Sequence, residues 1–230
     1  GETSGDDTTA VALPLTLVDS RSTRAAVLPT QARALTVLHN RELVTTPDAL
    51  TDFTGNRPRA STRDILLALP EGMSYSTGDH LAIYPTNGDA LVGRACERMD
   101  LSPVDLIHIE SERCPPHLPA GVTLSAGQLL AQFLELQEPA SRRDLRVLAA
   151  HSPCPHTRQP LQQLAEDSER YHREIQEKRQ SVLDLLEHYP AIDLPIEVFA
   201  ALCPPLRARF YSISSSALVR PDQVRLTVGT

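Results

Sequence analysis

A stretch of helix-like sequence separates two groups of strand-like segments, and this order limits the folds that the chain can adopt. Strand patterns at 62–69 and 79–84 precede the stretch, and strand patterns at 209–214 and 223–228 follow it. The stretch between them has apolar residues at helical spacing over 89–99, 125–134, 141–150, 168–189 and 196–202. Because strands need partners, the two groups are expected to meet in one antiparallel barrel or sandwich, with the helices inserted between them.

The expected divisions of the chain follow this order. The first segment is polar and acidic at its start, which is typical of a linker, and it could contain a short edge strand at 13–18. Another strand is expected within 34–44, and a loop rich in Pro, Gly, Asn and Asp over 45–60. The four divisions are 1–30, 31–88, 89–203 and 204–230.

Composition excludes several classes of protein. The chain has 230 residues, of which 41% are hydrophobic, so a sizeable core can be buried. The formal net charge of −7 argues against a nucleic-acid surface, which needs a concentrated basic patch. No run approaches the roughly 18 apolar residues of a membrane span, and no signal peptide is recognisable. A cytoplasmic protein with neither nucleic acid nor membrane as a partner is expected.

No metal site is predicted. The four cysteines are widely spaced and are expected to be reduced thiols that are mostly buried. The segment His151–His156 contains two histidines and a cysteine, which are ligand types that suit zinc. However, its two prolines stiffen the segment, and no complementary pair of ligands lies at the spacing of a zinc finger.

The octet Arg209–Ser216 carries the strongest functional pattern. Successive side chains of a strand face opposite ways, so Arg209, Tyr211 and Ile213 share one face and Phe210 points to the other. That shared face offers a guanidinium for a phosphate and, beside it, a flat ring for a planar heterocycle such as a flavin. The alternative is a serine-rich strand end with one tyrosine half in the core.

Arg-x-Tyr-Ser-x-x-Ser resembles the FAD-binding strand of the ferredoxin-reductase superfamily, and the longer serine run resembles the diflavin reductases. The segment Gly78–Asn87 is similar to the Gly-Asp-His-x-x-x-x-Pro-x-Asn segment of those proteins. Parts of 40–63 and 135–190 resemble the bacterial fused monooxygenases, in which one polypeptide carries haem, FMN and FAD domains. The resemblance covers about residues 34 to 228.

The resemblance implies roles for individual residues. The family's arginine contacts the FAD pyrophosphate, its tyrosine lies flat against the isoalloxazine ring, and its serine lies near N5 and assists hydride transfer from NADPH. Ser212 is therefore the predicted catalytic residue. The predicted cofactor-binding residues are Arg209, Tyr211, Ser212, Ile213, Ser214 and His80.

Three of these residues also have simpler structural interpretations. His80 follows a Gly-Asp turn, and it is expected to order the loop or to pack beside the cofactor rather than to act in catalysis. Ser212 could instead bond its own backbone at the strand end. Two of the three serines Ser214, Ser215 and Ser216 are expected to stabilise backbone turns.

The fold class that the resemblance implies is α+β, with an incomplete antiparallel FAD-binding β-barrel and an inserted all-helical connecting domain. In the family, a glycine-rich segment and an NADPH domain follow the Arg-x-Tyr-Ser strand, and an FMN domain precedes the FAD domain. The chain is therefore expected to be a truncated segment of a larger reductase, inactive alone and binding FAD weakly or not at all.

The implied parent passes electrons from NADPH through FAD and FMN to a haem. Its FMN and haem domains are the expected partners within the same polypeptide, with the NADPH domain downstream. Two alternatives stay open. One is the FAD domain of a sulfite-reductase flavoprotein, and the other is a non-catalytic α+β interaction module that has lost flavin binding.

Overall fold

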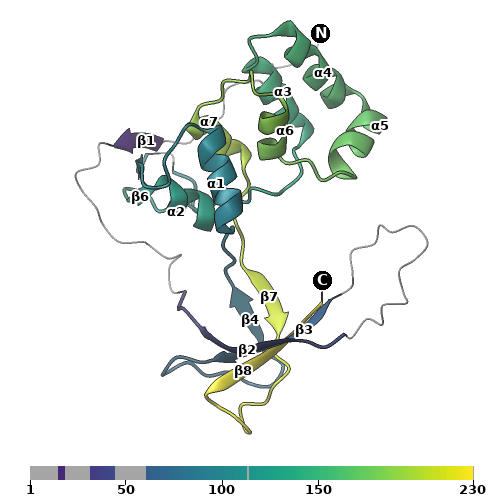
Figure 1. Ribbon diagram of the computed structural model, residues 1–230. Coiled ribbons are helices and arrows are strands. Elements are labelled where there is room, and N and C mark those ends of the chain that lie inside the picture. Colours follow the sequence, from purple (N-terminus) through teal and green to yellow (C-terminus); the bar gives the residue numbers. More distant parts are fainter. Residues whose placement is uncertain (1–14, 19–31, 45–60, 113, 230) are drawn as a thin grey trace, which may run out of the picture. The chain divides into compact units, whose positions relative to one another are not determined.

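A computed structural model describes residues 15–18, 32–44, 61–112 and 114–229. The chain divides into two compact units (Figure 1). The strand unit combines the described residues of 32–85 with 208–229, whereas the helical unit combines the described residues of 86–207 with the first strand, 15–18. The mixed α+β class expected from the sequence is confirmed. Within the described residues, no helix is both long enough and apolar enough to cross a membrane.

The strand unit contains a three-stranded antiparallel sheet and a two-stranded ribbon. The sheet has the order β2-β3-β8, formed by Thr36–Glu42, Thr62–Ala68 and Gln223–Gly229. The ribbon pairs β4 (His80–Ile83) with β7 (Arg209–Ser212), so segments far apart in the sequence lie side by side (Figure 1). The described strands do not close into a barrel.

Successive side chains of β3 point to opposite faces of its sheet, and one of these faces covers a small core. Leu67 faces inward and packs with Ile213, Val224 and Leu226 in a small core, and Ile213 forms an isolated bridge with Leu226. This bridge is the point at which the ribbon joins the sheet. It fixes the end of the Arg209–Ser216 octet against β8.

The opposite face of the same sheet contains a buried carboxylate. Asp64 is only 4% exposed, and its Oδ2 accepts a hydrogen bond from His39 Nε2 at 3.0 Å. Arg41 and Arg225 lie 3.4 Å and 3.5 Å from its two oxygens. The His39 hydrogen bond, aided by Arg225 and Arg41 and opposed by burial, lowers the pKa of the Asp64 carboxyl. The charged form is therefore the one that holds the three strands together.

The helical unit is built around a larger core. Its elements after β1 (Leu15–Val18) are α1 (Asp89–Arg98), β5 (Leu106–Ile109), β6 (Thr123–Ser125), α2 (Ala126–Gln132), α3 (Arg142–Ala150), α4 (Pro155–Glu166), α5 (Ser168–Tyr171), η1 (His172–Gln176), α6 (Val182–His188) and α7 (Ile196–Leu202). Ser125 and Ser141 begin α2 and α3, two of the expected helices, with capping boxes.

The prediction that this unit is all-helical is wrong. It contains a three-stranded antiparallel sheet of order β1-β5-β6, with the short strand expected within 13–18 at one edge. Ile107 and Ile109 of β5 are fully buried. A mainly apolar segment of only four residues cannot be assigned to a strand or a helix by periodicity alone, so its partners decide its conformation.

The prediction of a single helix over 168–189 is also wrong. A π-helical turn ends it, and Arg179 adopts a left-handed φ of 51°. The Gln180 amide then donates to the Ile175 carbonyl, and Ser181 starts α6 with a new capping box. A further helix, α4, was not predicted, although Pro155 occupies its first turn, where proline is favoured.

Candidate functional site

The β4–β7 ribbon fixes the relative positions of the predicted site residues. In its antiparallel register His80 lies opposite Ser212, and Leu81 lies opposite Tyr211. Arg209 lies opposite Ile83. Because directly opposed residues project on the same side of a sheet, the ribbon has one face with His80 and Ser212 and another with Tyr211 and Arg209.

The first face brings two polar side chains together. Ser212 Oγ and His80 Nε2 are 3.1 Å apart, within hydrogen-bonding distance, and both residues are exposed. Phe210 is on this face too and is 71% exposed, on the side of the strand away from Tyr211 as the alternation predicts. Histidine and serine residues 132 positions apart in the sequence thus form one polar pair.

The second face rests on the core of the strand unit. Tyr211 is half-buried and packs with Leu81 and Ile83 against the small core, while Arg209 is exposed at the start of the strand. Two residues along a strand span about 6.6 Å. The side chains of Arg209 and Tyr211 therefore start from backbone positions about 6.6 Å apart on the same face of the strand.

The remaining predicted residues are held by the surrounding backbone. Ile213 is 9% exposed in the core, and its amide donates to the Asp79 carbonyl at 3.0 Å. The amide and hydroxyl of Ser214 both donate to the Arg225 carbonyl of β8. Their side chains stabilise the strand end, so any contact of Ile213 with a ligand would have to come from its backbone.

The loop before β4 contributes residues that the sequence did not single out. Tyr75 Oη and Ser215 Oγ share a hydrogen bond of 2.7 Å, and Ser215 Oγ also accepts the Arg225 amide. Asp79 accepts the Ser76 amide at 2.8 Å, which confirms the predicted turn. The partner of Tyr75 is 140 positions away, so no local pattern could have revealed it.

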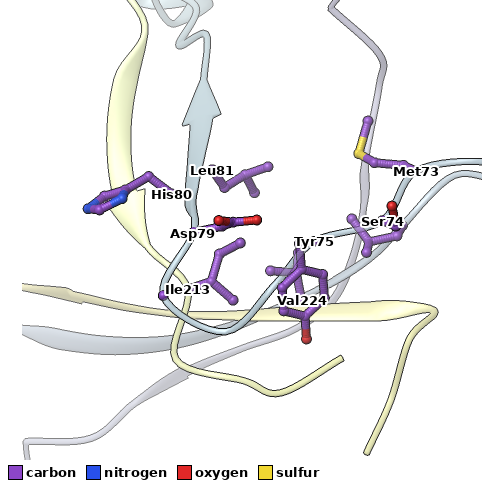
Figure 2. A pocket seen from close by; sticks show the side chains of 10 residues that line it. Met73, Ser74, Tyr75, Asp79, His80, Leu81, Ile213 and Val224 are labelled. Atoms are coloured by element: carbon purple, nitrogen blue, oxygen red, sulfur yellow. The ribbon is translucent and has the colours of Figure 1, made fainter. Parts of the chain in front are cut away.

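A cavity of about 290 Å³ lies between this loop and the core. Its walls are Leu69, Met73, Ser74, Tyr75, Gly78, Asp79, His80, Leu81, Ile213 and Val224. Figure 2 shows Asp79 and Leu81 directed toward the side of Ile213, whereas the His80 ring points the other way. The cavity wall thus combines apolar side chains with the Asp79 carboxylate, and the exposed pair of His80 and Ser212 meets it only through His80.

The helical unit has a cavity of its own, of about 530 Å³, that shares no residue with the octet. His117 borders it, and burial lowers the pKa of its imidazole, so the ring is neutral at pH 7. His117 Nε2 is buried without a hydrogen-bond partner among the described residues. The histidines and cysteine of the His151–His156 segment do not line this cavity. The described residues contain no group of three or more His, Cys, Asp or Glu side chains that could hold a metal ion.

The structure can be tested for its fit to a flavin nucleotide. Within four consecutive residues of one strand, Arg209 and Tyr211 offer a cation and an aromatic ring on one face, and Ser212 offers an exposed hydroxyl on the other. These are the groups that a phosphate, a planar ring and a ring nitrogen would contact. The residues present fit such a cofactor.

Comparison with known proteins matches the chain to a family model and to several curated proteins. A family model described as "FAD binding domain" matches residues 64–229. The bifunctional cytochrome P450/NADPH–P450 reductase 2 of Bacillus subtilis is 41% identical over 193 residues, which are 84% of this chain and 17% of that protein. The corresponding bifunctional protein of Fusarium oxysporum is 42% identical over 165 residues, 72% of this chain and 15% of that protein.

The protein ascE of Acremonium egyptiacum, with the same bifunctional description, is 38% identical over 206 residues, 90% of this chain and 18% of that protein. The chain therefore spans less than a fifth of the length of each of these three relatives. The resemblance found from the motifs is confirmed by both kinds of match. The motif strand β7, its partner strand β4 and the family model agree, and the chain belongs to the FAD-binding domain family.

Proposed function

We propose that the chain is the FAD-binding segment of an NADPH-dependent diflavin reductase that delivers electrons to a haem monooxygenase. The supporting observation is that the family match spans the strand in which Arg209, Tyr211 and Ser212 occur together. FAD, when bound, supplies a centre that takes a hydride and releases single electrons. The protein's own residues bind and orient it.

Each side chain has a distinct proposed task. Arg209 binds the pyrophosphate through its planar array of N–H donors. Tyr211 packs its ring against one face of the isoalloxazine and shields it from water. Ser212 directs its hydroxyl at N5, where the flavin gains a hydrogen on reduction. Ser214 and the backbone of Ile213 keep the strand end in place.

The partners of the segment belong to this proposal as well. The helical unit would be the connecting domain, inserted between the two parts of the FAD domain. FMN, haem and NADPH domains of the same polypeptide would be its functional partners, since the relatives are described as fusions of a cytochrome P450 and an NADPH–P450 reductase. The cytoplasmic location expected from the sequence stays a prediction.

A comparison of three flavins would test the roles of Arg209 and Tyr211. The purified chain is titrated with FAD, FMN and riboflavin, which differ in phosphate content but share the ring, and flavin fluorescence is followed to high concentration. Arg209→Ala should weaken FAD binding roughly tenfold, as expected for a lost charged hydrogen bond, and leave riboflavin binding unchanged. Tyr211→Ala should weaken the binding of all three.

Arg220 supplies the matched control. It is an exposed arginine of the strand unit, in the turn before β8, and Arg220→Ala should change none of the affinities. Equal losses for Arg209→Ala and Arg220→Ala would show only a general effect of charge. Weak or absent binding by this chain alone agrees with the expectation for a segment of a larger reductase. A longer polypeptide that includes the proposed NADPH domain and still binds none of the flavins would favour the non-catalytic interaction module.

A further inference from the structure

The antiparallel register of the β4–β7 ribbon brings His80 and Ser212 together. His80 is the first residue of β4 and Ser212 the last of β7, and they are directly opposite each other. Their side chains approach to 3.1 Å on the exposed face. Among the residues that the structure describes, neither side chain has a second hydrogen-bond partner.

The chemistry of the pair allows two arrangements. A neutral imidazole has one nitrogen that donates and one that accepts, while a hydroxyl has one hydrogen and two lone pairs. If His80 Nε2 carries the hydrogen, it donates to Ser212 Oγ and leaves the serine hydrogen available for another acceptor. If Nε2 lacks the hydrogen, the serine donates to it, and Ser212 Oγ can only accept from a third group.

The surroundings leave this pair open toward a ligand. The next residues along the same face are Ala82 and Phe210, which offer no hydrogen bond. The carboxylate of the adjacent Asp79 is turned away and accepts the Ser76 amide. A group that binds over Ser212 would therefore meet a hydroxyl whose direction is set by one imidazole.

We propose that His80 is a positioning residue for Ser212, fixing its hydroxyl and deciding whether that hydroxyl donates or accepts a hydrogen bond toward the flavin N5. The inference rests on the proposed function for its ligand, but the pair itself exists without one. N5 accepts a hydrogen bond when the flavin is oxidised and carries a hydrogen when it is reduced. The two arrangements of the pair match these two requirements.

The pair can be tested in the flavin-free chain by nitrogen NMR of the imidazoles. Removing the hydroxyl in Ser212→Ala should shift the His80 Nε2 resonance, because its hydrogen-bond partner is lost. Ser76→Ala is the matched control, since Ser76 lies in the preceding loop and uses its backbone rather than its hydroxyl. An unchanged His80 resonance in Ser212→Ala would overturn the proposal whether or not FAD binds.

The action of His80 through Ser212 is tested by a double-mutant cycle on FAD affinity. His80→Leu and Ser212→Ala should each weaken binding by about two- to tenfold, the range for one hydrogen bond. The double variant should match the single Ser212→Ala variant within about twofold, and His80→Gln, which keeps a polar group, should retain most of the affinity. Additive losses would refute the positioning role, because His80 would then contact the flavin by itself.

Different results would contradict the proposed function and the positioning role of His80. If a longer polypeptide that includes the proposed NADPH domain binds no FAD but the His80 resonance responds to Ser212→Ala, the proposed function is wrong and the positioning of the hydroxyl stands. If FAD binds and the resonance does not respond, the proposed function stands and the positioning role is wrong.

Discussion

Glu42, at the end of β2, has a carboxyl group whose pKa is strongly lowered by hydrogen bonds. Its oxygens accept hydrogen bonds from the Ser61 hydroxyl and from the amides of Thr62 and Val44. These bonds, with the Ser61 hydroxyl as the largest cause, lower the pKa of Glu42 from 4.5 to about 2. The ionised carboxylate therefore links the end of β2 to the start of β3.

We predict that the Glu42 carboxyl titrates near pH 2 in an NMR titration. Ser61→Ala should raise its pKa toward 4.5 without reaching it, because the two amide donors remain. Because the folded-state pKa is depressed, this contribution to stability is present above the ordinary value and is lost as the pH falls from about 4.5 to about 2. Ser74→Ala is the control, and a midpoint near 4.5 in the wild type would contradict the prediction.

At the level of single residues, the sequence predicted the composition of the candidate site better than its contacts. The alternation of Arg209, Tyr211 and Ser212 is local, so it could be inferred from strand geometry alone. The hydrogen bond of Ser212 with His80 depends on a register between strands 132 positions apart, and that of Tyr75 with Ser215 on a span of 140. Such contacts have no local signal.

Among the helices, α6 offers a direct test of local capping. Ser181 accepts the Asp184 amide, and the Asp184 carboxylate in turn accepts the Ser181 amide. Ser181→Ala should lower the free energy of unfolding by about 1 kcal/mol, whereas Ser181→Asn should keep most of it because asparagine is also a good cap. Urea denaturation measures both, and equal losses would indicate that burial of Ser181, rather than capping, stabilises this position.

Helical periodicity predicted helices of the helical unit whether or not a side chain caps their start. Ser125 and Ser141 cap α2 and α3, whereas α1 and α7 were predicted equally well and have no side-chain cap. The helix break near Arg179 was missed because it depends on partners distant in the sequence. The Gln180 carbonyl accepts a hydrogen bond from the Ala140 amide, and Ser181 forms an isolated β-bridge with Pro139. A charged, proline-free stretch favours one long helix until such contacts compete with it.

At the scale of the whole molecule, the two units have separate cores. The core of the helical unit includes Leu148, which is fully buried, and the small core of the strand unit includes Leu226, also fully buried. Among the residues that the structure describes, none belongs to both cores. The candidate flavin residues of the octet lie in the strand unit, so their stability is expected to depend first on its core.

This separation predicts different outcomes for two matched substitutions. Leu148→Ala and Leu226→Ala each remove a fully buried leucine and should each cost about 2–5 kcal/mol. Amide hydrogen exchange should then show lost protection in α3 but not in β3 for Leu148→Ala, and the reverse for Leu226→Ala. Only Leu226→Ala should also weaken flavin binding. If both variants lose protection in both elements, the chain unfolds as one cooperative body, and the helical unit contributes directly to the stability of the strand that bears Arg209, Tyr211 and Ser212.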